Sequence, residues 1–162
     1  MTKDITLLSG SGIYTLLLHV NKEVTVTVGK LGKPRFPKGY YSYTGSALGK
    51  GTSLKNRVAR HLSKEKRMFW HIDYLLADEN VSVEAVLAAE TRQKTECETN
   101  HHIKSLLGAE VKSKGFGASD CTKNCQSHLL YFPDVKNVDC LVQKLVAYLE
   151  SASAVLSVHL IC

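Results

Sequence analysis

Apolar residues in the first third of the chain follow the patterns of β-strands. Residues 13–20 form a nearly continuous apolar run, and residues 24–28 alternate valine with threonine. Both patterns favour strands. The short polar step between them predicts an antiparallel hairpin that ends at Gly29. After the proline- and glycine-rich residues 32–39, the aromatic segment 40–45 predicts a third strand.

Helical periodicity begins after this strand. Leu54, Val58 and Leu62 recur every four residues and predict an amphipathic helix, which Thr52 or Ser53 would cap. The later elements predicted in chain order are a short helix near residues 69–76, a strand at 81–88, a helix at 95–107, a strand at 128–132, a helix at 135–149 and an apolar tail at 155–161. This mixture indicates an α/β (α+β) fold.

Length and composition narrow the class of protein. The chain has 162 residues, of which 44% are hydrophobic and 22% charged, as in an ordinary globular domain. Its apolar stretches are shorter or more interrupted than the roughly 20 residues that span a bilayer. The N-terminus lacks a secretory pattern, so we expect a cytoplasmic protein whose five cysteines are reduced and which has no membrane partner.

Charge is divided unevenly along the chain. Residues 1–70 hold 13 Lys/Arg against 3 Asp/Glu, whereas residues 71–162 hold 8 against 12. A basic half of this kind suits a surface that binds a polyanion such as nucleic acid. The alternative is a set of cations that only solvate the surface.

Seven short motifs and their order along the chain point to a family. The motifs are Gly12-Ile13-Tyr14, Gly39-Tyr40-Tyr41, the run 43–49 that begins Tyr43-Thr44-Gly45, the helix segment 57–61, the segment 70–75, Glu96-Cys97 and the segment 115–121. Together they resemble the GIY-YIG nuclease superfamily, and most closely its small single-domain branch. The resemblance covers about residues 10–132. We therefore expect a nuclease domain at 1–132, with a C-terminal helix and apolar tail at 133–162 packed on it.

The resemblance implies a small central, mainly antiparallel sheet flanked by helices, and metal-dependent hydrolysis of DNA. Such an enzyme would act in repair, or in processing of structured or single-stranded DNA. By resemblance, Tyr14 would act on the attacking water with Tyr43 beside it, Arg57 would bind the scissile phosphate, and His61 would assist. Phosphodiester hydrolysis needs an activated water, a cation near the developing charge and a metal with oxygen ligands, and these residues offer such groups.

The same resemblance places one Mg²⁺ or Mn²⁺ ion on the helix that holds Glu96 and Glu98. These two residues cannot share a helix face, and we favour Glu96 because Glu96-Cys97 matches the branch. Glu98 stays an alternative metal ligand, because Asn100 follows it closely, as an asparagine does in parts of the wider superfamily. The expected nucleic-acid contacts are Gly45, Ser46, Lys50, Arg60 and Lys64.

Other interpretations of these residues stay open. An unperturbed phenol has a pKa of about 10 and needs a nearby cation to act as a base. Ser46 stands where excision-repair relatives often have lysine, so Lys50 or the metal would have to compensate. Tyr14 and Tyr43 could instead be packing residues in strands. The alternative function is a non-catalytic nucleic-acid-binding module that has lost nuclease activity.

Cysteines and glycines of the second half could form further sites. Cys121, Cys125 and His128 have a spacing that suits zinc, with Cys97, His101 or His102 as a fourth ligand. We favour ordinary buried thiols over zinc. The glycine-rich loop at 115–120 could contact phosphate, or Asp120 could bind the metal, but a structural turn is favoured. His71 and Asp73 are expected to be structural polar anchors.

Overall fold

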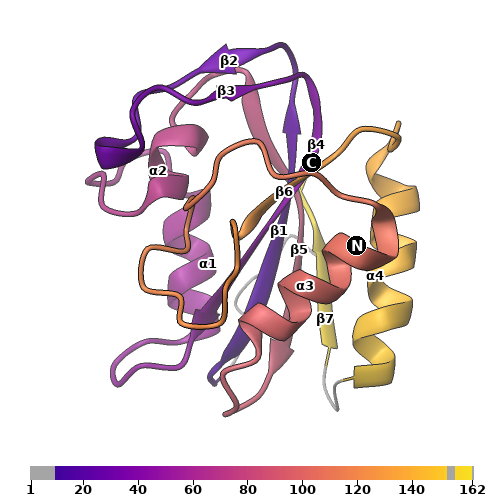
Figure 1. Cartoon of the computed structure of the whole chain (residues 1–162). Helices are drawn as coiled ribbons and strands as arrows, with labels where there is room; N and C mark the ends of the chain where they lie inside the picture. The colour runs from indigo at the N-terminus through magenta and orange to yellow at the C-terminus, as the bar shows by residue number, and fades with distance from the viewer. Residues whose placement is uncertain (1–9, 153–155, 162) are drawn as a thin grey trace.

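A five-stranded antiparallel sheet lies at the centre of the computed structural model, which describes residues 10–152 and 156–161 (Figure 1). Its strands are β1 (Gly12–Val20), β4 (Gly39–Ala47), β5 (Val81–Glu90), β6 (Leu129–Phe132) and β7 (Leu156–Leu160), in the order β6-β4-β1-β5-β7. The helices are α1 (Leu54–Leu62), α2 (His71–Leu76), α3 (Glu96–Leu107) and α4 (Val138–Ala152). The α+β class and the antiparallel sheet with flanking helices are confirmed.

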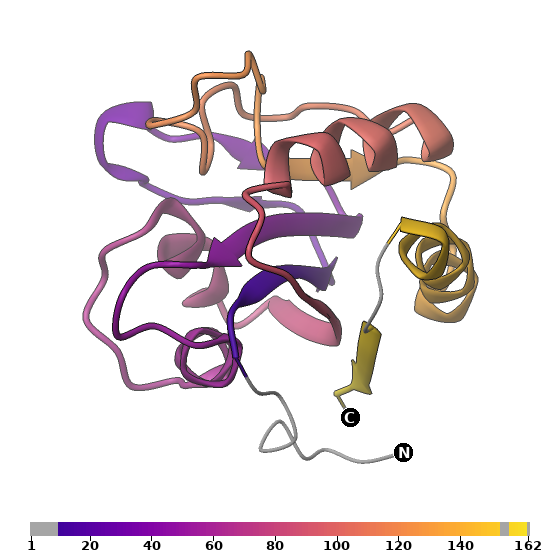
Figure 2. The ribbon, with the colours of Figure 1, turned by 90° about the horizontal axis from the view of Figure 1, so that it is seen from below.

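Helices cover both faces of the sheet (Figures 1 and 2). Leu16 and Leu18 belong to the core under α1 and α2, whereas Leu17 belongs to the core under α3 and α4. Successive side chains of a strand point to opposite faces, so a central strand covered on both sides must be apolar throughout. This burial explains the continuous apolar run that predicted β1.

The predicted pairing of the first two strands is wrong. Residues 24–25 form β2 (Val24–Thr25), which pairs with β3 (Arg35–Phe36) in a separate two-stranded sheet. β1 is instead hydrogen-bonded to β4 on one side and β5 on the other, so neither of its edges is free for β2. The small β2-β3 sheet is fixed by Phe36, whose buried ring packs edge-on against Phe116.

Gly12, the first residue of β1, is required by a close backbone approach. A Cβ atom there would lie 2.1 Å from the carbonyl oxygen of Ala89 and 2.9 Å from Leu54. Any larger residue would push β1 away from β5. The first glycine of the motif therefore has a packing role.

The C-terminal region adds a helix and an edge strand. α4 begins at Val138, three residues later than expected, where the Asn137 side chain accepts a hydrogen bond from the Cys140 amide. The segment expected to be only an apolar tail forms β7, which pairs with β5. Val155, at the start of that expected tail, lies outside the described residues.

No helix in the described part of the chain is long and apolar enough to cross a membrane.

Candidate functional site

A cavity of about 460 Å³ lies where β1, β4, α1 and the start of α3 meet. It brings together six residues that the sequence singled out from four separate elements. These residues are Tyr14, Tyr43, Gly45, Ser46, Arg57 and Glu96. Tyr14 and Tyr43 come from neighbouring antiparallel strands, as predicted.

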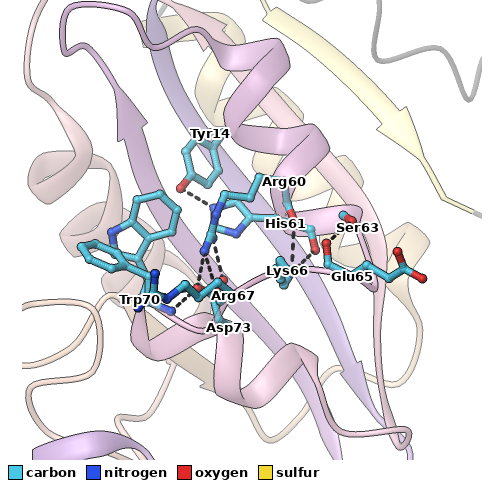
Figure 3. A network of polar contacts seen from close by, with 10 residues as sticks. Tyr14, Arg60, His61, Ser63, Glu65, Lys66, Arg67, Trp70 and Asp73 are labelled. Carbon is cyan, nitrogen blue, oxygen red and sulfur yellow. Dashed lines mark hydrogen bonds and ion pairs between the residues drawn. The ribbon is translucent and has the colours of Figure 1, made fainter.

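Tyr14, which lines this cavity, is paired with His61, which does not line it. The Tyr14 hydroxyl lies 2.7 Å from His61 Nε2, and both side chains are buried (Figure 3). Burial lowers the pKa of His61 to about 3, and the neighbouring Lys66 contributes to the same shift. The imidazole is therefore neutral at physiological pH, and it can hydrogen-bond a neutral phenol.

Both tyrosines are held in the neutral form. Burial raises the pKa of Tyr14 well above its usual value, Tyr43 adds to that shift, and Arg57 opposes it. Burial likewise raises the pKa of Tyr43. A resident phenolate is thus disfavoured, so any role of Tyr14 as a base requires transfer of its own proton to a partner.

Glycines create the space in which the tyrosines lie. Gly45 is the cross-strand partner of Tyr14, and a Cβ atom on Gly45 would lie 2.5 Å from the Tyr14 hydroxyl oxygen. Gly117 has a φ of +67°, and a Cβ atom there would lie 2.8 Å from the Tyr43 ring. The glycines next to both tyrosines therefore admit the rings that line the cavity.

Arg57 supplies a cation that is not committed to another charge. Its guanidinium carbon lies 4.3 Å from the centroid of the Trp70 ring, which lines the same cavity. Within the described residues, Arg57 has no ion-pair partner. An arginine held against an aromatic face in this way is free to bind an anion through its N–H groups.

Arg60 differs from Arg57, although both contact Trp70. Its guanidinium donates two hydrogen bonds of 2.8 Å to Asp73, which is fully buried (Figure 3). Burial would raise the pKa of Asp73, but the bonds from Arg60 and from the Trp70 and Phe69 amides lower it overall. Asp73 is thus the structural anchor that was expected, and Arg60 is engaged in holding the α1-α2 corner.

The other cations expected at the site lie elsewhere. Lys50 and Lys64 are exposed and do not line the cavity. Lys94, which sequence reasoning missed, does line it, and its Nζ lies 3.9 Å from Glu96. The available signal was position, because Lys94 comes just before the acidic turn of the predicted helix.

The structure separates the two candidate carboxylates. Glu96 is 6% exposed, lines the cavity, and its Oε2 is buried with no hydrogen-bond partner. The Glu98 side chain is 55% exposed and forms an ion pair of 2.6 Å with Lys123 outside the cavity. Asp120 also lines the cavity, from the glycine-rich loop. The orphaned carboxylate oxygen of Glu96 fits a cation ligand.

His71, the other expected anchor, has two roles. Its Nδ1 accepts a hydrogen bond of 2.9 Å from the Gly117 amide, which ties α2 to the glycine-rich loop. It also lines the cavity. The loop is therefore part of the cavity wall as well as a turn.

A second group of side chains lies beside the cavity. The ligand atoms of Cys97, Cys121, Cys125 and His128 all lie within 4.8 Å of one another, so this cluster could hold a metal ion. Thiolate and imidazole donors suit zinc better than Mg²⁺ or Mn²⁺. The sequence favoured ordinary thiols and left the fourth ligand open. Of its three candidates, Cys97 is in the cluster, whereas His102 stacks on Tyr148.

These features define a small α+β domain with a tyrosine-lined cavity and a cysteine-histidine cluster. Residues 13–151 match a family described as domain of unknown function DUF123, and the chain belongs to that family. The chain matches no curated protein and no solved structure. Its function must therefore be inferred from the site.

Proposed function

We propose that the protein is a GIY-YIG-type endonuclease that hydrolyses phosphodiester bonds in DNA with one Mg²⁺ or Mn²⁺ ion. The observation that carries the proposal is the convergence of Tyr14, Tyr43, Arg57 and Glu96 on one cavity. These residues lie far apart in the sequence and offer a proton carrier, a cation and a metal ligand. The basic first half of the chain supports a polyanionic substrate.

Proton transfer in this site would run through Tyr14 and His61. The attacking water gives a proton to the Tyr14 oxygen while the Tyr14 proton passes to His61 Nε2, 2.7 Å away. Burial disfavours the charged form of His61 and holds its pKa low. A bound phosphate diester adds negative charge nearby, which raises that pKa and favours the transfer.

Charge stabilisation would come from Arg57 and Lys94. Arg57 would bind non-bridging oxygens of the phosphate, and Lys94, which lines the same cavity next to Glu96, offers a second cation. Glu96 would hold the divalent ion through its unpartnered oxygen. That ion, when bound, supplies polarisation of the phosphate and neutralisation of developing charge.

The substrate is proposed to be recognised by shape. Arg57 and Lys94, the cations that line the cavity, suit contacts to phosphate oxygens. Phosphate contacts position a protein on DNA without reading its sequence. We therefore propose single-stranded or branched DNA as the substrate, with a role in repair in the cytoplasm.

The test is cleavage of labelled single-stranded, duplex and branched DNA with Mg²⁺, Mn²⁺ or a chelator. Arg57→Ala is compared with Lys55→Ala, because Lys55 is exposed on the same helix and does not line the cavity. We expect metal-dependent cleavage that Arg57→Ala lowers by roughly 100-fold and Lys55→Ala retains. Salt-sensitive binding without cleavage would instead identify the non-catalytic nucleic-acid-binding module.

A further inference from the structure

The cysteine-histidine cluster joins two segments that are distant in sequence. Cys97 lies in the first turn of α3, whereas Cys121, Cys125 and His128 belong to the connection that precedes β6. Cys97 and His128 are buried, with 7% and 6% of their surface exposed. Four soft donors from two segments therefore meet at the boundary of the protein interior.

Distances within the cluster match those of a tetrahedral zinc site. With Zn–S bonds of about 2.3 Å and Zn–N bonds of about 2.0 Å, ligand atoms lie about 3.8 Å apart for two sulfurs and about 3.5 Å for sulfur and nitrogen. Cys97 Sγ lies 3.5 Å from Cys121 Sγ and 3.7 Å from His128 Nε2. All the ligand atoms lie within 4.8 Å of one another, so small side-chain movements complete the tetrahedron.

The backbone around these ligands is arranged to hold them. The Lys123 amide lies 3.4 Å from Cys121 Sγ, to which it donates a hydrogen bond. Asn124, at φ 58°, closes the turn that brings Cys125 back, and asparagine tolerates this left-handed conformation. The amide of His128 donates to Phe116 at 2.8 Å, which fixes the histidine beside the sheet.

The donor set decides among possible occupants. Magnesium and manganese prefer oxygen ligands, whereas thiolate and imidazole select zinc. Cys97, Cys121 and Cys125 are free thiols, and the Cys97-Cys121 sulfur separation of 3.5 Å is far beyond a covalent bond. Four protein ligands fill the tetrahedral shell and leave no position for water, which is the pattern of a structural site.

We propose that Cys97, Cys121, Cys125 and His128 bind one structural Zn²⁺ ion that fastens α3 to the loop preceding β6. On binding, the three thiols release their protons to solvent, and zinc with three thiolates and a neutral imidazole carries one net negative charge. The site is distinct from the proposed divalent ion of the nuclease and does not depend on that function.

The proposed zinc site shares its neighbourhood with the tyrosine-lined cavity. Glu96 directly precedes Cys97, and His128 lines the cavity as well as the cluster. A Cβ atom on Gly117, in the same loop, would lie within 3.3 Å of the His128 Cβ. Through Cys97 and His128, a bound zinc ion would help to position both the cavity carboxylate and the loop that packs against Tyr43.

The first experiment measures metal content. The full chain, purified without chelator, is analysed by plasma mass spectrometry, and we expect about one zinc per chain. Replacing zinc with Co²⁺ should give the intense visible absorption of tetrahedral thiolate coordination. Cys121→Ser should weaken zinc affinity by at least about 100-fold, beyond the roughly 10- to 100-fold caused by losing a neighbour of a ligand.

Two control variants separate this site from the other side chains nearby. Cys140→Ser removes an exposed thiol on α4, and His101→Ala removes an imidazole that lies 3.5 Å from Cys125 Sγ but is not in the cluster. Both should retain about one zinc per chain and the Co²⁺ spectrum. Loss of zinc in His101→Ala with retention in His128→Ala would overturn the assigned ligand set.

A further readout does not depend on variants or on DNA. Stripping the wild-type chain with a chelator should speed amide hydrogen exchange in residues 115–128 and at the start of α3, while α4 stays unchanged. Re-adding zinc should restore the slow exchange, and re-adding Mg²⁺ should not. Metal-free protein with titratable free thiols, no Co²⁺ spectrum and unchanged exchange would overturn the proposal, whatever the nuclease assays show.

Discussion

The tyrosine cavity and the cysteine-histidine cluster are neighbours with opposite designs. Glu96 and Cys97 are adjacent in sequence, yet one lines an open cavity with an unpartnered oxygen and the other lies among three further soft donors. An open site with unpaired groups suits a reaction, whereas a closed set of ligands suits structure. Under the two proposals, one helical turn carries a residue of the reaction and a ligand of the structural ion, and separate variants should uncouple the two.

The largest effect is expected from Tyr14→Phe. The variant removes the hydroxyl that lies 2.7 Å from His61 and should lower cleavage by roughly 10³-fold, within the range of general acid-base contributions. Zinc content should stay unchanged because no ligand is touched. Cleavage rates on labelled DNA and metal analysis of the same sample check both statements, and full activity would remove Tyr14 from the proposed proton path.

Glu96→Gln tests which of the two carboxylates in the first turn of α3 binds the divalent ion. It removes the charge that would bind the divalent ion and should lower cleavage by roughly 100-fold, as loss of one charge-stabilising group does. Glu98→Gln is the matched control, since Glu98 lies outside the cavity and pairs with Lys123. Equal loss in both variants, measured at saturating Mg²⁺, would contradict the assignment of Glu96.

Acid should lower the stability of the folded protein through His61. The folded pKa is lowered to about 3 from 6.5, so below pH 6.5 the unfolded chain binds a proton that the folded chain does not. Stability is present above the unfolded pKa and is lost as pH falls, by about 2 kcal/mol between about pH 7 and about pH 5. Urea unfolding of the wild-type protein and of His61→Gln at both pH values measures this loss of stability. A wild-type loss no larger than that of His61→Gln would contradict the assignment to His61.

The smallest effect is expected from Gly117→Ala, which lies between the two regions. Alanine at φ +67° costs about 1 to 2 kcal/mol by itself. A Cβ atom 2.8 Å from the Tyr43 ring adds a smaller cost for shifting that ring, so the free energy of unfolding should fall by more than it does in the control below. Gly108→Ala is the control, because it shares a positive φ but has open space around it. If both variants lose the same stability in thermal unfolding, the close packing against Tyr43 contributes nothing.

Local patterns in the sequence identified much of the fold. The apolar run of β1, the aromatic segment of β4 and the four-residue repeat of α1 were predicted because each reflects burial along one element. The partner of β2 was not predictable, since pairing depends on which edges of β1 are already occupied. The tail was recognised as apolar, but its place beside β5 depends on an edge that only the folded sheet exposes.

The candidate site divides in the same way. The sequence by itself indicated Tyr14, Tyr43, Arg57 and Glu96 as candidates, because the order of the short motifs along the chain resembles that of the GIY-YIG superfamily. The sequence favoured Glu96 over Glu98 only through its match to the branch. The tertiary structure places Glu96 at the cavity and Glu98 outside it, engages Arg60 with Asp73, and brings Lys94 to the cavity. It also added Cys97 to the cluster. The physical reason is that the sequence gives the type and local spacing of each side chain directly, whereas contacts between distant segments depend on burial and on the packing of whole elements.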